Sequence, residues 1–134
     1  MIRSLTFALT LATGVTVTPV ATHSLRVVDG DTIVYNKFTY RLAAYDAPEI
    51  RGARCVAEFD RGMRARDRLR DLLAGPYTLT LVLCANRKLQ DKYGRYCATA
   101  RVAGEDVGSI LVRERLAVRF GSGKPDWCNR GERR

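Results

Sequence analysis

Two neighbouring stretches decide the fold of this protein: residues 25–35, LRVVDGDTIVY, and residues 38–46, FTYRLAAYD. Both are rich in β-branched and aromatic residues, which favour β-strands. The letters DGD interrupt the first stretch with a glycine-containing turn, and Asn36-Lys37 is a turn signal between the two stretches. Pro48 closes the section, because a residue that precedes proline is disfavoured in a helix. The section therefore predicts three strands in succession.

Residues 57–73, AEFDRGMRARDRLRDLL, predict a helix, because apolar residues recur on one helical face opposite arginine and aspartate. That apolar face consists of Phe59, Met63, Leu69, Leu72 and Leu73. Gly75-Pro76 then stops the helix. A second, short helix is predicted within residues 105–120, EDVGSILVRERLAVRF. Its inward-facing residues are Ile110, Leu111 and Leu116.

Between these helices the sequence predicts a pair of strands. YTLTLVLC (residues 77–84) alternates as a strand, DKYG (91–94) is a turn, and RYCATARVAG (95–104) returns as a strand. At 134 residues the chain fits one domain with a single core. We therefore predict a mixed α+β fold, mainly β: a five-stranded OB-fold barrel of order β-β-β-α-β-β-α, with a helix across one end. This domain is expected to span residues 24–134, with a short irregular tail after Gly121.

Residues 1–23 are expected to be a signal peptide or an N-terminal extension. No charged residue lies between Arg3 and Arg26, and LTFALTLATGV (residues 5–15) is similar to the apolar core of a secretory signal peptide. The alternative is an added strand, because apolar residues alternate over residues 5–11. The run is too interrupted for a transmembrane anchor. A signal peptide would place the protein in the periplasm or outside the cell; otherwise it is cytoplasmic.

Four cysteines, Cys55, Cys84, Cys97 and Cys128, lie far apart without a CxxC pair, which argues against a zinc site. An even number of cysteines behind a predicted leader favours two disulfides, for which three pairings exist. Cys84 and Cys97 flank the predicted strand pair as candidate cross-strand neighbours, in which case Cys55 and Cys128 tie the middle of the chain to its tail. Four buried free thiols are the alternative for a cytoplasmic protein.

The charge of the chain favours a polyanionic partner. Lys and Arg total 23 against 14 Asp and Glu, which gives a net charge of +9. Nucleic acid fits this excess better than an anionic membrane surface does, and a cationic surface that merely confers solubility is the alternative. We expect a monomer without stable membrane association.

Any catalysis would have to use carboxylates and arginines, with or without a metal. The only histidine is His23, so neither a Ser-His-Asp nor a Cys-His set can be assembled. Asp31 lies in the first turn and Asp46 at the end of the next strand pair, where adjacent strands can bring them together. Two close carboxylates repel each other unless a cation neutralises them, and Ca²⁺ does so with their oxygens, a carbonyl and waters.

Glu49 and two arginines complete the candidate site. Glu49, three residues after Asp46, could orient or deprotonate a water molecule. Arg41 precedes Asp46 and Arg95 follows the DKYG turn, and guanidinium groups pair with phosphodiester oxygens and stabilise the charge of the transition state. Singly, each residue has an ordinary interpretation as a turn cap or a solvated side chain. Together, at strand ends, they indicate a site.

The blocks VVDGDT, RLAAYDAPE and DKYGRYCATARVAGEDVGSILVRERLA closely resemble the staphylococcal nuclease (thermonuclease-like) family, from about Leu25 to Phe120. The resemblance implies an OB-fold barrel that hydrolyses DNA and RNA with Ca²⁺. The implied site consists of Asp31, Asp46 and the Ala47 backbone carbonyl for calcium, Glu49 as general base, Arg41 and Arg95 as phosphate clamps, and Lys92 and Tyr93 as substrate contacts. Asp29 would support this site. The family's tyrosine-bearing nucleotide-pocket segment is not evident after Phe120.

The leading hypothesis is therefore a calcium-dependent nuclease that acts on DNA, RNA or both. A non-catalytic OB-fold module that binds nucleic acid is the alternative, since barrels of this family also serve as interaction domains. A structural protein held together by disulfides is a third interpretation, which leaves the carboxylates and arginines unexplained.

Overall fold

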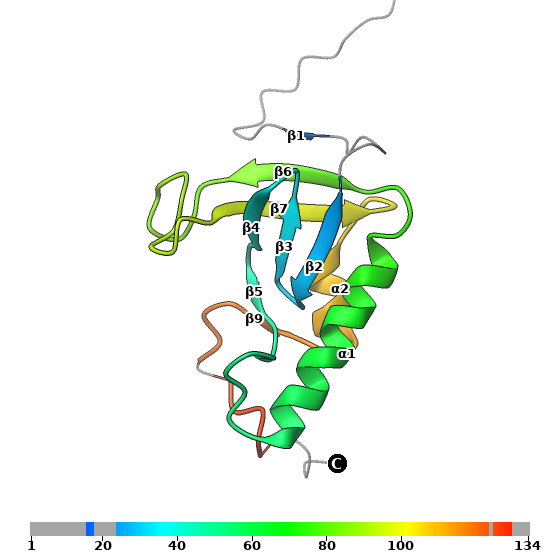
Figure 1. Ribbon diagram of the computed structural model, residues 1–134, viewed down its shortest axis with the longest axis vertical. Helices are drawn as coiled ribbons and strands as arrows, with labels where there is room; N and C mark the ends of the chain where they lie inside the picture. The colour runs from blue at the N-terminus through cyan, green and yellow to red at the C-terminus, as the bar shows by residue number, and fades with distance from the viewer. Residues whose placement is uncertain (1–15, 18–23, 124, 130–134) are drawn as a thin grey trace, which may run out of the picture.

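The structure is a computed structural model in which residues 16–17, 24–123 and 125–129 are described. These residues form a mixed α+β fold, mainly sheet, which confirms the predicted class (Figure 1). The strands are β1 (Thr16–Val17), β2 (Leu25–Asp29), β3 (Thr32–Tyr35), β4 (Phe38–Leu42), β5 (Tyr45–Asp46), β6 (Thr78–Val82), β7 (Tyr96–Val102), β8 (Glu105–Asp106) and β9 (Val118–Arg119). The helices are α1 (Val56–Leu72) and α2 (Val107–Arg113). The five longest strands and the two helices follow the predicted order.

The main sheet has the strand order β1-β6-β7-β4-β3-β2, with β8 paired to β7, while β5 and β9 form a separate pair. Strand β4 runs parallel to β7, and the other pairs are antiparallel. The predicted turn between β3 and β4 is confirmed: Asn36 and Lys37 have φ angles of 48° and 70°. This tight hairpin sets Thr32 opposite Arg41. The residue before Thr32, Asp31, therefore lies beside the strand that carries Arg41.

We predicted that five strands close into a barrel, but the strand pairings do not close the sheet. The described residues give an open sheet in which β2 is a terminal strand. Strand β6 pairs with β7 on one edge and with β1 on the other, where Thr16 faces Thr80 and Val17 faces Leu79. Because a strand has only two edges, this part of β6 has none left for β2. The strand expected over residues 5–11 lies outside the described residues.

Helix α1 lies along β2 and covers one side of the sheet (Figure 1). Its buried residues are Glu58, Gly62, Ala65 and Leu69. Leu73, just after the helix, is buried as predicted, but Phe59 is 42% exposed and its predicted inward position is wrong. The middle of the buried face, at Gly62 and Ala65, is made of small residues because the helix approaches the chain closely there. A β-carbon at Gly62 would lie 2.9 Å from the carbonyl oxygens of both Pro48 and Glu49.

Helix α2 packs against β7 and also contacts α1. Asp106 caps it, accepting a hydrogen bond of 3.0 Å from the Ser109 backbone N–H. Ile110 and Leu111 are buried and Leu116 is partly buried, as predicted. The largest fully buried side chains include Ile33, Leu42, Leu69, Val107 and Leu111, so both helices and the sheet contribute to one core.

Two disulfides link Cys55 to Cys128 and Cys84 to Cys97, with Cα–Cα distances of 6.0 Å and 5.3 Å. Of the three pairings that the sequence allows, this is the one in which Cys84, just after β6, is joined to Cys97 in β7, and Cys55 is joined to the tail. Disulfides of this kind are typical of proteins that fold in oxidising compartments. Neither helix in the described part of the chain has the length and apolar character that crossing a membrane requires.

Candidate functional site

Asp31 and Asp46 converge on the side chain of Arg41. The Nη2 atom of Arg41 lies 3.3 Å from Oδ2 of Asp31 and also forms an ion pair with Oδ1 of Asp46. The backbone brings them together in two ways: the β3–β4 pairing places Asp31 beside Arg41, and a turn at Ala44, with φ of 73°, reverses the chain into β5. The Nη1 atom of Arg41 donates to the Tyr45 carbonyl at 2.9 Å, which fixes the guanidinium further.

Asp31 is the most buried acid of this group. Its Oδ2 accepts the Ala47 N–H at 2.8 Å, and its Oδ1 accepts the Thr32 hydroxyl at 3.1 Å. Burial raises the pKa of Asp31 to about 7; Arg41 opposes the rise and the Asp29 carboxylate adds to it. A cation beside this carboxylate therefore determines whether it is charged near neutral pH.

Glu49 lies at the same cleft, three residues after Asp46 and at the exposed end of the loop that follows β5. Partial burial raises its pKa, and so do the negative charges of Asp29 and Glu58, whereas Arg41 and Arg95 lower it. A carboxylate with a raised pKa accepts a proton more readily than an ordinary glutamate does. Glu49 is thus suited to act as a base.

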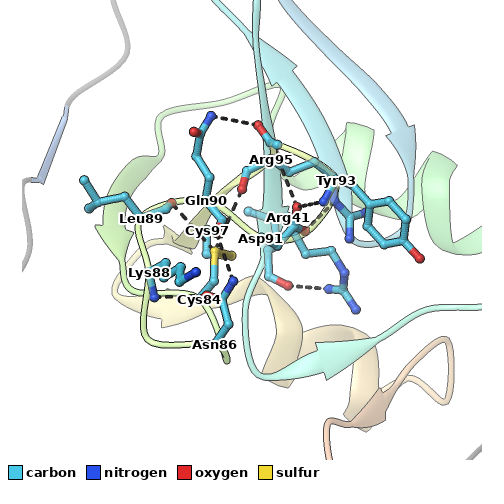
Figure 2. Close-up of a disulfide and its surroundings, with 12 residues drawn as sticks. Arg41, Cys84, Asn86, Lys88, Leu89, Gln90, Asp91, Tyr93, Arg95 and Cys97 are labelled. Carbon is cyan, nitrogen blue, oxygen red and sulfur yellow. Dashed lines mark hydrogen bonds and ion pairs between the residues drawn. A yellow bond between two sulfur atoms is a disulfide. The ribbon is translucent and has the colours of Figure 1, made fainter.

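Arg95 is held on the other wall by the turn that precedes β7. Its Nε donates to Oδ2 of Asp91 at 2.7 Å, and its guanidinium carbon lies 5.2 Å from the centre of the Tyr93 ring (Figure 2). The Nζ atom of Lys92 lies 5.0 Å from the same ring. Tyr93 is 70% exposed, so its ring is accessible at the cleft. The predicted DKYG turn therefore presents two cations and an aromatic ring together.

These groups line one open cleft with a volume of about 750 Å³. The structure brings seven of the sequence-predicted residues to its walls: Asp31, Arg41, Asp46, Glu49, Lys92, Tyr93 and Arg95. Ala47, the eighth, is buried behind Asp31 and contacts it through its backbone N–H. The Cys84–Cys97 disulfide also lines the cleft.

The cleft residues that sequence reasoning missed include Asp91, Leu83 and Phe120. The sequence could have indicated Asp91, because an aspartate four residues before an arginine, with a glycine turn between them, is well placed to form an ion pair with that arginine. Leu83 and Phe120 are each 60% exposed, and no pattern in the sequence distinguishes them from ordinary strand residues.

Asp31 and Asp46 are the residues that could hold a small cation, in the place that the Arg41 guanidinium takes between them. One carboxylate oxygen from the turn between β2 and β3 and one from β5 face the same positively charged nitrogen, and Ca²⁺ prefers such oxygen ligands together with carbonyls and waters. Within residues 16–17, 24–123 and 125–129, no group of three or more His, Cys, Asp or Glu side chains is arranged to hold a metal ion. A cation here would therefore take two carboxylates from Asp31 and Asp46 and complete its shell with backbone and water oxygens.

Comparison with known proteins yields no family model that matches this chain and no curated protein with a significant match to its sequence.

Proposed function

We propose that this protein is a calcium-dependent nuclease that hydrolyses phosphodiester bonds of DNA, RNA or both. One observation carries the proposal: the carboxylates of Asp31 and Asp46 both contact the same positively charged atom, Nη2 of Arg41. The same cleft contains a carboxylate suited to act as a base and a second arginine. This combination is suited to the hydrolysis of a phosphodiester.

An OB-type fold is part of this proposal. The strand order β6-β7-β4-β3-β2, with β4 parallel to β7, agrees with an OB-type barrel that is open between β2 and β6. The resemblance of the DGDT, DAPE and DKYGR blocks to the staphylococcal nuclease family supports the same fold. In such barrels, loops at one end of the strands carry the binding residues.

Asp31, Asp46 and the Ala47 carbonyl would hold the calcium ion. A bound Ca²⁺ would neutralise the two carboxylates and polarise the phosphate that is to be cleaved. Once the carboxylates have that counter-ion, the Arg41 guanidinium no longer has to balance their charge and can pair with a phosphate oxygen. Arg41 and Arg95 then stabilise the negative charge that develops on the phosphate in the transition state.

Glu49 accepts a proton from a water molecule as the water oxygen bonds to phosphorus. The bond between phosphorus and one ester oxygen breaks, and the leaving alkoxide takes a proton from solvent. The products are a phosphate monoester and a free hydroxyl. The positively charged surface would attract the polyanion, and Lys92 and Tyr93 would contact it beside the cleaved bond.

Export and a monomeric state complete the proposal. The two disulfides fit an oxidising compartment, and the N-terminal segment would supply the signal peptide, whose removal would take β1 away from the edge of β6. A secreted or periplasmic nuclease would meet millimolar calcium, which suits a site with only two carboxylates.

The test is a cleavage assay on single-stranded DNA and RNA with Ca²⁺, with Mg²⁺ and with a chelator. We expect calcium-dependent cleavage that the chelator abolishes and that Glu49→Gln and Arg95→Ala each reduce about 100-fold or more. Arg26→Ala, which replaces an exposed arginine outside the cleft, serves as the control. Cleavage that persists in excess chelator would contradict the mechanism, and salt-sensitive binding without cleavage would instead support the non-catalytic binding module.

A further inference from the structure

The loop between β6 and β7, residues 83–95, has almost no apolar attachment to the rest of the protein. Of its thirteen residues, all described, Cys84 alone is buried. Leu83, Leu89 and Tyr93 are 60%, 66% and 70% exposed. A segment with so few buried contacts opens easily unless something else holds it. In Figure 1 this loop extends beyond the end of the sheet.

Hydrogen bonds inside the loop define its shape. Asp91 accepts the Tyr93 and Arg95 backbone N–H groups at 2.9 Å and 3.0 Å, and Asn86 accepts the Lys88 N–H at 2.9 Å. These bonds join loop residues to one another. They hold two small turns together but do not fix where those turns lie relative to β4.

The side chain of Arg95 depends on this loop. Arg95 directly precedes β7, but its guanidinium is aimed by Asp91 and lies over the ring of Tyr93, both of which are loop residues. A shift of the loop therefore moves the guanidinium even where β7 stays in place.

The Cys84–Cys97 disulfide attaches the loop to the sheet (Figure 2). Cys97 is in β7, opposite Arg41 in the parallel pairing with β4. The Sγ atom of Cys84 lies 3.7 Å from the Leu89 carbonyl oxygen and 3.9 Å from that of Arg95. The disulfide thus lies close to carbonyl oxygens in both turns of the loop, and its Cys97 end lies beside Arg41, the other arginine of the cleft.

We propose that the Cys84–Cys97 disulfide is a positioning element that holds Arg95 in register with Arg41 and Glu49, so that nuclease activity requires this disulfide and is lost when a dithiol reduces it. The inference rests on the proposed nuclease function. Reduction transfers two electrons and two protons from the dithiol, which becomes a disulfide, while Cys84 and Cys97 become thiols. Reoxidation restores the link. A chain made in a reducing compartment would stay inactive until it reached an oxidising one.

The first experiment compares two disulfide deletions. Cys84→Ala with Cys97→Ala removes the link in the cleft, and Cys55→Ser with Cys128→Ser removes the link outside it. Serine at residue 55 keeps a side-chain acceptor at the cap of α1, where the Cys55 sulfur accepts the Glu58 N–H. Below the melting temperature of both variants, we expect kcat to fall about 10- to 100-fold for the first pair and much less for the second.

A double-mutant cycle separates positioning from a general loss of stability. If the disulfide acts through Arg95, Arg95→Ala costs much less activity in the background that lacks Cys84 and Cys97 than in the wild type. Equal losses in both backgrounds would overturn the inference. Circular dichroism of each variant confirms that the comparison is made on folded protein.

A redox titration tests the inference on protein that retains Cys84 and Cys97. In the Cys55→Ser, Cys128→Ser background only one disulfide remains, and its reduction by a dithiol is followed by thiol alkylation and mass measurement. We expect the loss of activity to follow reduction and to be reversed by reoxidation. Full activity of the completely reduced protein refutes the inference alone, whereas absence of cleavage by the oxidised wild-type protein refutes the proposed nuclease function itself.

Discussion

Gly62 sets the position of Glu49, and replacing it tests whether that position matters. A β-carbon at Gly62 would meet the carbonyl oxygens of Pro48 and Glu49 at 2.9 Å, about 0.5 Å closer than the 3.4 Å at which ordinary contact begins. Both obstacles are backbone atoms, which cannot rotate aside. In Gly62→Ala the loop after β5 must therefore move away from α1 by about 0.5 Å.

The magnitude follows from two opposing terms for stability and one for catalysis. Alanine gains about 1 kcal/mol of helix propensity over glycine, and overpacking costs about 1–3 kcal/mol, so the variant should be about 0–2 kcal/mol less stable. Since misplacing a catalytic group by about 1 Å can cost 100-fold in rate, half that displacement of Glu49 should lower kcat on the order of 10-fold.

The assay is calcium-dependent cleavage at a temperature where Gly62→Ala remains folded, with urea denaturation to measure stability. Gly75→Ala is the matched control, because a β-carbon at Gly75 would meet nothing within 4 Å. An unchanged kcat in folded Gly62→Ala would refute the reasoning. An equal loss of activity in Gly75→Ala would show that the effect does not come from the contact with Glu49.

Three further predictions concern the metal, the loop and the tail. Saturating Ca²⁺, at about 100 times its dissociation constant, should stabilise the wild type by about 2.7 kcal/mol and raise its melting temperature, and Asp46→Asn should lose most of that shift. Burial alone would raise the pKa of Asp91, but the Arg95 side chain and the backbone N–H groups of Arg95 and Tyr93 outweigh it and lower the pKa below the ordinary 3.8. The resulting stabilisation is present above pH 3.8 and is lost as the pH falls through the lowered value, so the stability difference between wild type and Asp91→Asn should vanish in acid denaturation series. Removing Cys55–Cys128, whose residues are 73 positions apart, should cost about 4 kcal/mol of unfolding free energy by loop closure and show in urea midpoints.

The secondary structure was largely predictable because the strands alternate and the turns carry strong signals. The face of α1 was not, because hydrophobic periodicity follows large residues. Phe59 fits the apolar pattern but is exposed. Gly62 is buried where the helix approaches the loop around Glu49, and Ala65 is buried where the helix approaches Gly30. Close packing against backbone demands small side chains, and a glycine or alanine looks the same in the sequence whether it is buried or not.

Whether the main sheet closes into a barrel also could not be predicted from the sequence, because strand pairing at a sheet edge depends on which segment reaches that edge. The site was more accessible to prediction. Asp31 and Arg41 flank a tight hairpin, so their proximity follows from the register of two strands. The two-residue strand of Tyr45 and Asp46 then returns Asp46 to the same point. Residues such as Phe120, which reach the cleft from the far end of the chain, had no such local relation.

Arg41 and Arg95 are both proposed to contact the phosphate, but only one of them can be replaced without also disturbing the stability of the site. Arg41 balances Asp31, whose burial already raises its pKa to about 7, so removing Arg41 would also leave a buried carboxylate without its cation. A loss of activity in Arg41→Ala would therefore mix instability with catalysis. Arg95 pairs with Asp91 in a loop of which Cys84 alone is buried, so breaking that ion pair costs less than leaving the buried Asp31 carboxylate without its cation. The catalytic contribution of an arginine in this cleft is therefore best measured at Arg95.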